Sequence, residues 1–320
     1  MRVLVTGSNG FIGKPLVAAL EANGDAVVRV VRHVTSAEEM AIENIEDYTD
    51  WSTLLVGVDA VVHLAARVHD LRATKDQLAL YRRTNTQATL TLARAAQKAG
   101  VKRFVFISTL YRSRKISGAQ IASEEDKNIP YREIDTPTPD DAYGISKWEA
   151  ELGLQTMMGG EMEIVILRPA LVYGPQVRAN FLRFLTLPAS GLPLPLGAIR
   201  NQRSMIYNGN LVDAIMLCMR HPSAKNQTYL VADGEALSVP DLLRTLALLM
   251  QRQVFLLPVP KWVLQALGRL FGRTKDVERL TESLTVDTTK IRTQLSWVPP
   301  FTLQQGLEET VRWYQVHKKD

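Results

Sequence analysis

The sequence predicts an α/β protein in which a parallel sheet covered by helices is followed by a smaller, helix-rich C-terminal portion. Two observations support this class. Apolar runs of strand length alternate with amphipathic segments of helix length over residues 1–168, a pattern typical of parallel strands joined by crossover helices. The runs are apolar at successive positions, as expected of strands that are buried on both faces. We therefore divide the chain into residues 1–168 and residues 169–320.

The elements of the first part follow in order. The first strand is expected at residues 3–6, and the helix after it ends near Gly24, because glycine commonly follows the last turn of a helix. The run at 26–31 is rich in β-branched residues, which favour strands. Further strands are expected at 41–45, 59–66, 104–108 and 163–168, and helices at 11–23, 84–99 and 141–158.

The second part begins where prolines become frequent. Proline removes a backbone donor and ends helices, so short elements are expected there. Amphipathic periodicity nevertheless predicts four helices. They lie at 210–220, 239–251, 261–270 and 303–315.

Composition limits the classes of function. The 320 residues are 46% hydrophobic, which allows a substantial core, and the single cysteine, Cys218, excludes an intrachain disulfide. No signal peptide and no run of ~20 apolar residues is present, so we expect a cytoplasmic protein without a membrane span. The formal charge of +5 suits either an anionic substrate such as a diphosphate or a solvated basic surface. No nucleic-acid-binding signature is found, and nucleic acid is not an expected partner.

A glycine-rich loop connects the first strand to the first helix. Gly7, Gly10 and Gly13 have the spacing G-x-x-G-x-x-G. Glycines allow a tight turn and close approach of the backbone to a pyrophosphate, and the helix N-terminus offers free N–H groups to the phosphates. The position between a strand and a helix predicts a dinucleotide site in a Rossmann-type doubly wound sheet. A structural turn without ligand is the alternative.

The end of the second strand predicts which dinucleotide binds. An acidic residue there binds the adenosine ribose of NAD, whereas an arginine accommodates the 2′-phosphate of NADP. Arg32 occupies this position, so NADP(H) is slightly favoured over NAD(H). The alternative is an exposed arginine with NAD held by other contacts. Asn44 and Ile45 are placed to contact adenine, and His63 is interpreted as a packing residue beside the cofactor.

Tyr143 and Lys147 lie four residues apart, on one face of the expected helix 141–158. A phenol is a poor base at neutral pH, and a nearby ammonium is expected to lower its pKa. Tyr143 can then exchange a proton with a substrate hydroxyl while hydride passes to or from a nicotinamide. Thr109, at the end of the strand 104–108, is placed to bond the reacting oxygen, and Ser108 to contact the cofactor. Capping of the backbone is the alternative for both hydroxyls.

These blocks resemble the extended short-chain dehydrogenases/reductases, the NAD-dependent epimerase/dehydratase group that acts on nucleotide sugars. The resemblance covers nearly the whole chain. It rests on VLVTGSNGFIG, VVHLAA, FVFIST, YGISK, ILRPALVYGP, RSMIYNGNLVDA and LSWVPPFTLQQGLEETVRWY.

The resemblance implies a role for each part. Residues 1–168 would bind the dinucleotide and carry the catalytic Tyr143, Lys147 and Thr109, and residues 169–320 would mainly bind substrate. Arg203 would hold the substrate diphosphate, with Asn180 and Arg279 as further contacts. No metal is implied. The cofactor contacts would come from Gly7, Gly10, Phe11, Ile12, Gly13, Arg32, Asn44, Ile45, Ala65, Ala66, Asn85, Ser108, Tyr143 and Lys147.

The type of reaction stays partly open at this point. The 4,6-dehydratases of the family carry Asp-Glu after the catalytic Thr, whereas this chain has Leu110-Tyr111. The resemblance therefore implies a 4-epimerase or a 4-keto-reductase of a UDP-sugar in cell-surface polysaccharide synthesis. A ketoreductase of a non-sugar substrate and a non-catalytic dinucleotide sensor are the alternatives. By analogy with the family, the chain is expected to form a homodimer through its long helices, including the one with Tyr143.

Overall fold

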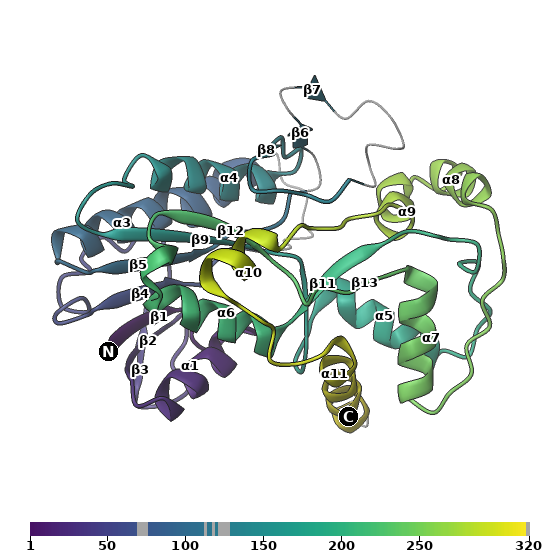
Figure 1. The fold of residues 1–320 in the computed structure, drawn as a ribbon, viewed down its shortest axis with the longest axis horizontal. Helices are drawn as coiled ribbons and strands as arrows, with labels where there is room; N and C mark the ends of the chain where they lie inside the picture. The colour runs from purple at the N-terminus through teal and green to yellow at the C-terminus, as the bar shows by residue number, and fades with distance from the viewer. Residues whose placement is uncertain (69–75, 112–113, 117–118, 121–128, 318–320) are drawn as a thin grey trace.

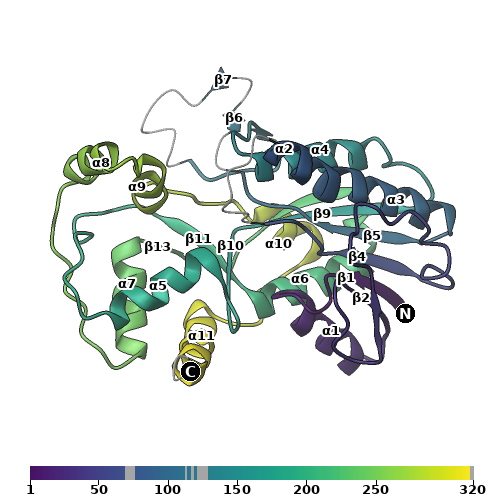
Figure 2. The same ribbon diagram turned by 180° about the vertical axis from the view of Figure 1, so that it is seen from behind.

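The computed structural model describes residues 1–68, 76–111, 114–116, 119–120 and 129–317 (Figure 1). It describes the side chains of these residues except those of 114–116, 119–120, 179, 180 and 275. Figures 1 and 2 show a sheet layered between helices, with a second group of helices beyond one edge of that layer. This arrangement confirms the predicted fold class.

A seven-stranded sheet forms the first part, and all of its neighbouring strands are parallel. The strand order is β12-β9-β5-β4-β1-β2-β3, so the order along the chain reverses between β1 and β4. Ligands of open α/β sheets bind at such a reversal, outside the carboxyl ends of the strands. The strands are β1 (Arg2–Thr6), β2 (Ala26–Val31), β3 (Glu39–Ala41), β4 (Ala60–His63), β5 (Arg103–Ile107), β9 (Glu163–Pro169) and β12 (Gln227–Val231).

Helices cover both faces of this sheet, which explains the continuous apolar runs. Val3 and Val5 of β1 belong to a buried cluster with Leu16 of α1, whereas Leu4 belongs to another cluster with Leu92 of α3. Successive strand residues point to opposite faces, so each face needs its own apolar set. One face is covered by α1 (Gly13–Ala22) and α6 (Asn208–Arg220), the other by α3 (Ala88–Lys98) and α4 (Ala142–Gln155).

Two elements of the first part begin at other residues than predicted, and the strand expected at 59–66 is β4, which ends at His63. The third strand was expected at 41–45 but is β3, at Glu39–Ala41, because Val31 of β2 pairs with Ala41 and β2 ends there. Residues 42–45 therefore lie beyond the strand, at the carboxyl edge of the sheet. The helix expected at 84–99 begins earlier, as α2 (Gln77–Tyr81), and passes through a π-helical segment, η1 (Arg82–Gln87), into α3.

The chain returns to the first sheet after residue 168. β12 pairs with β9, and α6 packs on the same face as α1. The expected division at residue 168 therefore marks where the first run of strands ends, and part of the later chain completes the sheet. β12 was not predicted, because it lies beyond the proline-rich segment where we expected helices.

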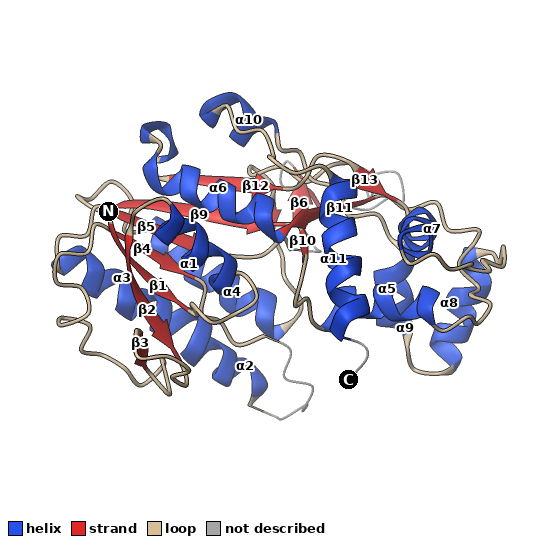
Figure 3. Ribbon diagram, turned by 90° about the horizontal axis from the view of Figure 1, so that it is seen from below, coloured by secondary structure: helices blue, strands red, loops and turns tan. Residues whose placement is uncertain are grey.

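The rest of the C-terminal portion contains a second sheet, β10 (Leu171–Tyr173), β11 (Arg203–Tyr207) and β13 (Ala236–Leu237). Figure 3 shows this sheet between the first sheet and helices α5 and α7. The helix α8 has its predicted bounds, and α5, α9 and α10 were not predicted. The helices here are α5 (Ala179–Ala189), α7 (Val239–Leu249), α8 (Lys261–Leu270), α9 (Thr274–Thr281), α10 (Thr289–Leu295) and α11 (Leu303–His317).

The remaining elements are short. A 3₁₀ turn, η3 (Pro222–Ala224), follows α6, and a small sheet contains β6 (Arg114–Ile116), β7 (Ala119–Gln120) and β8 (Thr136–Pro137). Within the described ranges, no helix has both the length and the apolar character that crossing a bilayer requires. The same ranges contain no group of three or more His, Cys, Asp or Glu side chains arranged to hold a metal ion.

Candidate active site

A cleft of about 1720 Å3 lies at the carboxyl edge of the first sheet. Its walls come from the loops after β1, β2, β4 and β5, from the start of α4, and from α5 and α9 of the C-terminal portion. The strand reversal between β1 and β4 opens into it, as expected for this sheet topology.

The glycine loop forms one wall of the cleft, in which the backbone at Gly7, Gly10 and Gly13 lies beside Phe11 and Ile12. Gly7 has φ +69°, and its N–H donates to the carbonyl of Val30 at 2.9 Å. A Cβ added to Gly13 would lie 2.1 Å from the Gly7 oxygen, and one added to Gly7 would lie 3.1 Å from the Ala65 nitrogen. Larger residues at Gly7 and Gly13 would collide with neighbouring backbone, so glycine is required for this tight turn. This is the geometry that a pyrophosphate requires at the start of a helix.

A buried chain of hydroxyls and an imidazole supports the loop after β4. Thr89 donates to the Asn85 carbonyl, so its oxygen accepts from Nε2 of His63 at 2.9 Å. Nδ1 of His63 then accepts from the Thr6 hydroxyl at 2.7 Å. The Thr6 oxygen in turn accepts from the N–H of Ala65 at 3.2 Å. Burial and the charge of Lys147 lower the pKa of His63 to about 3, so it is neutral and structural, consistent with the packing role predicted for it.

The π-helical segment presents Thr84 rather than Asn85 to the cleft. The Thr84 hydroxyl is buried, lines the cleft and has no hydrogen-bond partner among the described residues. Asn85 does not line the cleft. Its side chain accepts from the Arg67 N–H at 2.7 Å and donates to the Ser146 hydroxyl at 3.0 Å. Asn85 therefore joins the loop after β4 to α4 behind the cleft wall.

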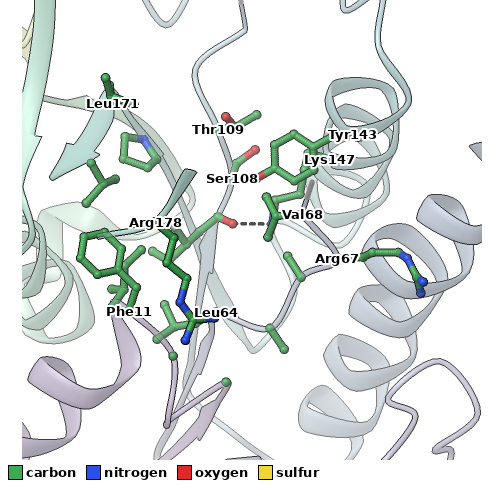
Figure 4. Close-up of a pocket in the computed structure, with 18 of the residues that line it drawn as sticks. Phe11, Leu64, Arg67, Val68, Ser108, Thr109, Tyr143, Lys147, Leu171 and Arg178 are labelled. Carbon is green, nitrogen blue, oxygen red and sulfur yellow. Dashed lines mark hydrogen bonds between the residues drawn. The ribbon is translucent and has the colours of Figure 1, made fainter. Parts of the chain in front are cut away.

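Tyr143 and Lys147 lie together at the first turns of α4, with Thr109 opposite them (Figure 4). Asp141 begins the helix by accepting from the Gly144 N–H at 2.8 Å. The Lys147 ammonium is buried and donates to the Ile107 carbonyl at 2.6 Å, and it lies 4.1 Å from the centre of the Phe106 ring. The end of β5 thus fixes both Thr109 and the ammonium.

The ionisation of this pair differs from the expectation. Burial raises the pKa of the Tyr143 phenol to about 12, and its hydrogen bond with Thr109 acts in the opposite direction. Burial lowers the pKa of Lys147 to about 7, against the effect of the Glu151 charge. The expected lowering of the Tyr143 pKa by Lys147 is therefore wrong for the protein alone, because burial dominates and the ammonium is held at Ile107. Tyr143 carries its proton at neutral pH.

Ser108 lines the cleft, but its hydroxyl is directed into the protein. It donates to Oε1 of Glu151, which also accepts from the Tyr111 hydroxyl at 2.9 Å. A contact from Ser108 to the cofactor stays a prediction.

Arginines dominate the part of the cleft that belongs to the C-terminal portion. Arg203 lines the cleft at the start of β11, and its Nη1 donates to the carbonyls of Arg279 and Glu282 at the end of α9. The guanidinium therefore fixes α9 as well as facing the cleft. Beyond residue 168 the described lining contains one acidic side chain, Asp276, and five arginines, which are Arg178, Arg183, Arg203, Arg273 and Arg279.

The sequence model of the NAD dependent epimerase/dehydratase family matches residues 3–232, which include the glycine loop and the Tyr143–Lys147 helix. The chain belongs to the NAD dependent epimerase/dehydratase family. The resemblance noted in the sequence is confirmed, and this epimerase/dehydratase is an enzyme that uses a nicotinamide dinucleotide.

Named relatives of this epimerase/dehydratase cover 97–99% of its length. A UDP-glucose 4-epimerase of Vibrio cholerae is 40% identical over 317 residues, covering 97% of this chain and 94% of the relative. An N-acetyl-α-D-glucosaminyl-diphospho-ditrans,octacis-undecaprenol 4-epimerase of Escherichia coli O157:H7 is 28% identical, covering 99% and 96%. The solved structure of a Thermotoga maritima UDP-glucose 4-epimerase with UDP-glucose superposes with a TM-score of 0.76 at 24% identity, covering 99% of each chain. This last likeness shows the fold.

The cleft of the epimerase/dehydratase collects most of the residues that the sequence singled out. Asn85 lies outside its lining, and the side chain of Asn180, in the first turn of α5, lies outside the described part. The sequence analysis missed Thr84 and Arg178, although Arg178 directly follows the GPQV segment after β10. The predicted residues that line the cleft are Gly7, Gly10, Phe11, Ile12, Gly13, Arg32, Asn44, Ile45, Ala65, Ala66, Ser108, Thr109, Tyr143, Lys147, Arg203 and Arg279.

Proposed function

We propose that this enzyme interconverts the C4 epimers of a UDP-sugar. The observation that carries the proposal is the pairing of two features in one cleft. Tyr143, Lys147 and Thr109 form a proton-exchanging group at the sheet edge, and five arginines line the opposite part, where they suit a diphosphate. The 40% identity to a Vibrio cholerae UDP-glucose 4-epimerase supports the same activity.

The side chains divide the chemistry at C4 between them. The bound dinucleotide supplies the acceptor and donor of hydride. As phenolate, Tyr143 takes the proton of the C4 hydroxyl in the oxidising half of the turnover and returns it to the C4 oxygen in the reducing half, so one residue serves both directions. The Thr109 hydroxyl, which lies beside Tyr143 in the cleft, is placed to orient the phenol and the substrate oxygen. The buried cation of Lys147 reduces the free-energy cost of the phenolate.

The glycine loop, the Thr84 hydroxyl and the small residues Ala65 and Ala66 suit the dinucleotide. The backbone cradle at Gly7 and Gly13 leaves no room for side chains, and Thr84 offers a buried hydroxyl without a partner among the described residues. We assign the cofactor to this half of the cleft and the substrate diphosphate to Arg203, Arg279 and Arg178.

We propose NAD as the working cofactor. Arg32 alone favours NADP(H), but Glu43 and Glu46 line the same end of the cleft. The N–H of Ile42 donates to the Val31 carbonyl at 2.8 Å, which brings the turns after β2 and β3 together. Carboxylates there repel a 2′-phosphate. An epimerase also returns its cofactor to the starting state in each turnover, which suits a retained NAD.

A dehydratase is less consistent with the site, whereas a 4-keto-reductase is not distinguished by it. The position two residues after Thr109 is Tyr111, whose hydroxyl is bonded to Ser108 and Glu151, so it supplies no acid for eliminating water. A 4-keto-reductase uses the same Tyr143 and Lys147 and differs in consuming reduced cofactor. The experiment must therefore measure both the sugar product and the cofactor balance.

The test is incubation of the purified enzyme with NAD and either UDP-glucose or UDP-N-acetylglucosamine, with the sugar followed by NMR. We expect the C4 epimer to form without net NADH, and Tyr143→Phe to stop its formation. Absence of interconversion, together with NADPH oxidation by a UDP-4-keto-sugar, would identify a reductase. Absence of any reaction with UDP-sugars, together with reduction of an apolar ketone, would contradict the sugar assignment.

A further inference from the structure

Helix α8 and the turn after it carry exposed large apolar side chains. Trp262 is 70% exposed, Leu270 75%, Phe271 70% and Leu267 46%. We call these four residues the α8 surface. Trp262 and Leu270 lie eight residues apart with Ala266 between them, so they share one stripe of the helix. Figures 1 and 2 place α8 at the end of the molecule away from the seven-stranded sheet.

The α8 surface is not needed for packing within the chain. The opposite side of α8 carries the buried Leu264 and Gly268. A Cβ added to Gly268 would lie 2.7 Å from Cγ2 of Val277, so α8 packs closely on α9 through that side. Trp262, Leu270 and Phe271, at least 70% exposed, therefore lie mostly outside this contact.

The charges along α8 itself and along the segment that leads into it have one sign, while the neighbouring α9 also carries Asp276 and Glu278. Residues 251–273 contain no Asp or Glu and four basic residues, Arg252, Lys261, Arg269 and Arg273. Arg269 is exposed and directly precedes Leu270. A helix with exposed Trp, Leu and Phe beside Lys and Arg is typical of helices that lie in the interface of an anionic bilayer.

We propose that the α8 surface docks the enzyme on an anionic lipid bilayer, with the four apolar side chains in the boundary between headgroups and acyl chains. Lys261 and Arg269 then face the anionic headgroups. A second copy of the chain is a poorer occupant, because a symmetric contact through this surface brings each basic cluster close to its own copy. An anionic bilayer complements both the apolar stripe and its charge.

The docked orientation has a consequence for the cleft. Val277 of α9 contacts Gly268 on one side and lines the cleft on the other, and Arg273, which follows the α8 surface, also lines the cleft. Docking through α8 therefore holds the arginine-rich end of the cleft beside the bilayer. This inference is independent of which reaction the site catalyses.

The test is flotation of the full-length enzyme with vesicles of phosphatidylcholine alone or mixed with phosphatidylglycerol. We expect binding to the mixed vesicles, weakening with salt, and weak binding to phosphatidylcholine alone. Trp262→Gln and Leu270→Gln should each reduce partitioning by about tenfold, and Arg269→Gln by severalfold. Val298→Gln and Val316→Gln, at sites 73% and 62% exposed, are matched controls that should leave partitioning unchanged.

Two further measurements keep the outcome decisive. All five tryptophans lie in the described part, and Trp262 is the exposed one among them. Its fluorescence emission should therefore shift to the blue on mixed vesicles. This shift should vanish in Trp262→Phe. Turnover of a soluble UDP-sugar should be unchanged in every α8 variant. Flotation that survives both Gln substitutions, or no flotation at all, overturns the proposal. So does a change of oligomeric state in these variants without lipid binding, which would assign the surface to self-association.

Discussion

The guanidinium of Arg168 and the carboxylate of Glu151 form a buried, bidentate ion pair. Nε of Arg168 donates to Oε1 of Glu151 at 3.1 Å, and Nη2 donates to Oε2 at 2.6 Å. Glu151 is fully buried, and Arg168 is 4% exposed. Hydroxyls of Ser108 and Tyr111 complete the bonding of Oε1. The pair joins α4 to the end of β9 one helical turn after Lys147.

We predict that Glu151→Gln destabilises the fold by about 3–5 kcal/mol, because it leaves the buried Arg168 cation uncompensated. Urea unfolding followed by circular dichroism measures the loss. Glu149→Gln is the matched control on the same helix, since Glu149 pairs bidentately with Arg82 at the surface and is 31% exposed in its side chain. That variant should lose less than about 1 kcal/mol. Equal losses in the two variants would contradict the role assigned to the buried pair.

Tyr143→Phe should remove most turnover while leaving dinucleotide affinity close to that of the parent, because it deletes only the proton-exchanging hydroxyl. Each tenfold loss in rate corresponds to about 1.4 kcal/mol of barrier, and we expect several such factors. Thr109→Val, which removes the hydroxyl beside Tyr143, should lose less turnover. Rates with a UDP-sugar and dinucleotide titrations separate the two effects. Unchanged turnover in Tyr143→Phe would contradict proton exchange by Tyr143.

The stability of the fold should rise with pH above neutrality because of the lowered pKa of Lys147. Its pKa in the folded enzyme is about 7, below the ordinary 10.5 that applies to the unfolded chain. Between these values the unfolded chain binds more protons, so stability rises with pH across this window and is reduced below it. Lys147→Met removes the buried charge, so its stability relative to the parent should be greatest at about pH 6 and decline toward about pH 9.

Thermal unfolding of both proteins across this range checks the prediction, and Lys147→Met should also lose turnover. If the stability of Lys147→Met relative to the parent increased with pH, this would contradict the lowered pKa of Lys147. Glu151→Gln provides a second check, because the Glu151 charge raises the pKa of Lys147 and its loss should lower that pKa further.

The sequence predicted the part of the fold that local signals determine. Continuous apolar runs identify strands buried on both faces, and the glycine spacing identifies the turn at Gly13, where a Cβ would collide with the backbone. It did not predict β12, because that strand completes the sheet through a pairing with β9 that is distant in sequence. The helices α5 and α9 were not predicted either, because α5 contains Pro188 and α9 is only eight residues long.

In the site, too, local sequence signals predicted some residues, whereas the folded structure determines others. Tyr143, Lys147 and Thr109 follow from spacing and from strand ends, so they were found. The facing of Thr84 into the cleft depends on the π-helical segment, which shifts Asn85 behind the wall, and the sequence has no simple signal for it. The raised pKa of Tyr143 likewise comes from burial, which spacing does not describe.

Arg32 and Glu43 should set the choice of dinucleotide in opposite directions. We expect the parent enzyme to bind NADH more tightly than NADPH. Arg32→Ala should weaken NADPH severalfold and leave NADH nearly unchanged, whereas Glu43→Gln should strengthen NADPH by removing a negative charge from the same end of the cleft. Calorimetric titration of both dinucleotides checks this. Tighter binding of NADPH by the parent would favour the interpretation based on Arg32 alone, and with it a reductase.

Arg203 combines two tasks that variants can separate. Its guanidinium lines the cleft, where a charge-assisted bond to the substrate diphosphate is expected, and Nη1 also bonds the carbonyls at the end of α9. We predict that Arg203→Ala weakens UDP binding by about 1.5–3 kcal/mol and barely changes dinucleotide binding, because the two ligands use different halves of the cleft. The measurement is a pair of titrations, with UDP and with NAD, on each protein.

Controls distinguish a direct contact from an effect through α9. Arg279→Ala removes a second guanidinium but keeps the backbone carbonyl that Arg203 bonds, so it should weaken UDP without loosening α9. Arg200→Ala, at an exposed position outside the cleft lining, should leave UDP affinity unchanged. If Arg203 acts only by holding α9, Arg203→Ala should lower thermal stability while Arg279→Ala leaves UDP affinity intact. If UDP and NAD weaken together, the two ligands do not occupy separate halves, and the assignment of the arginine-rich end to the diphosphate fails.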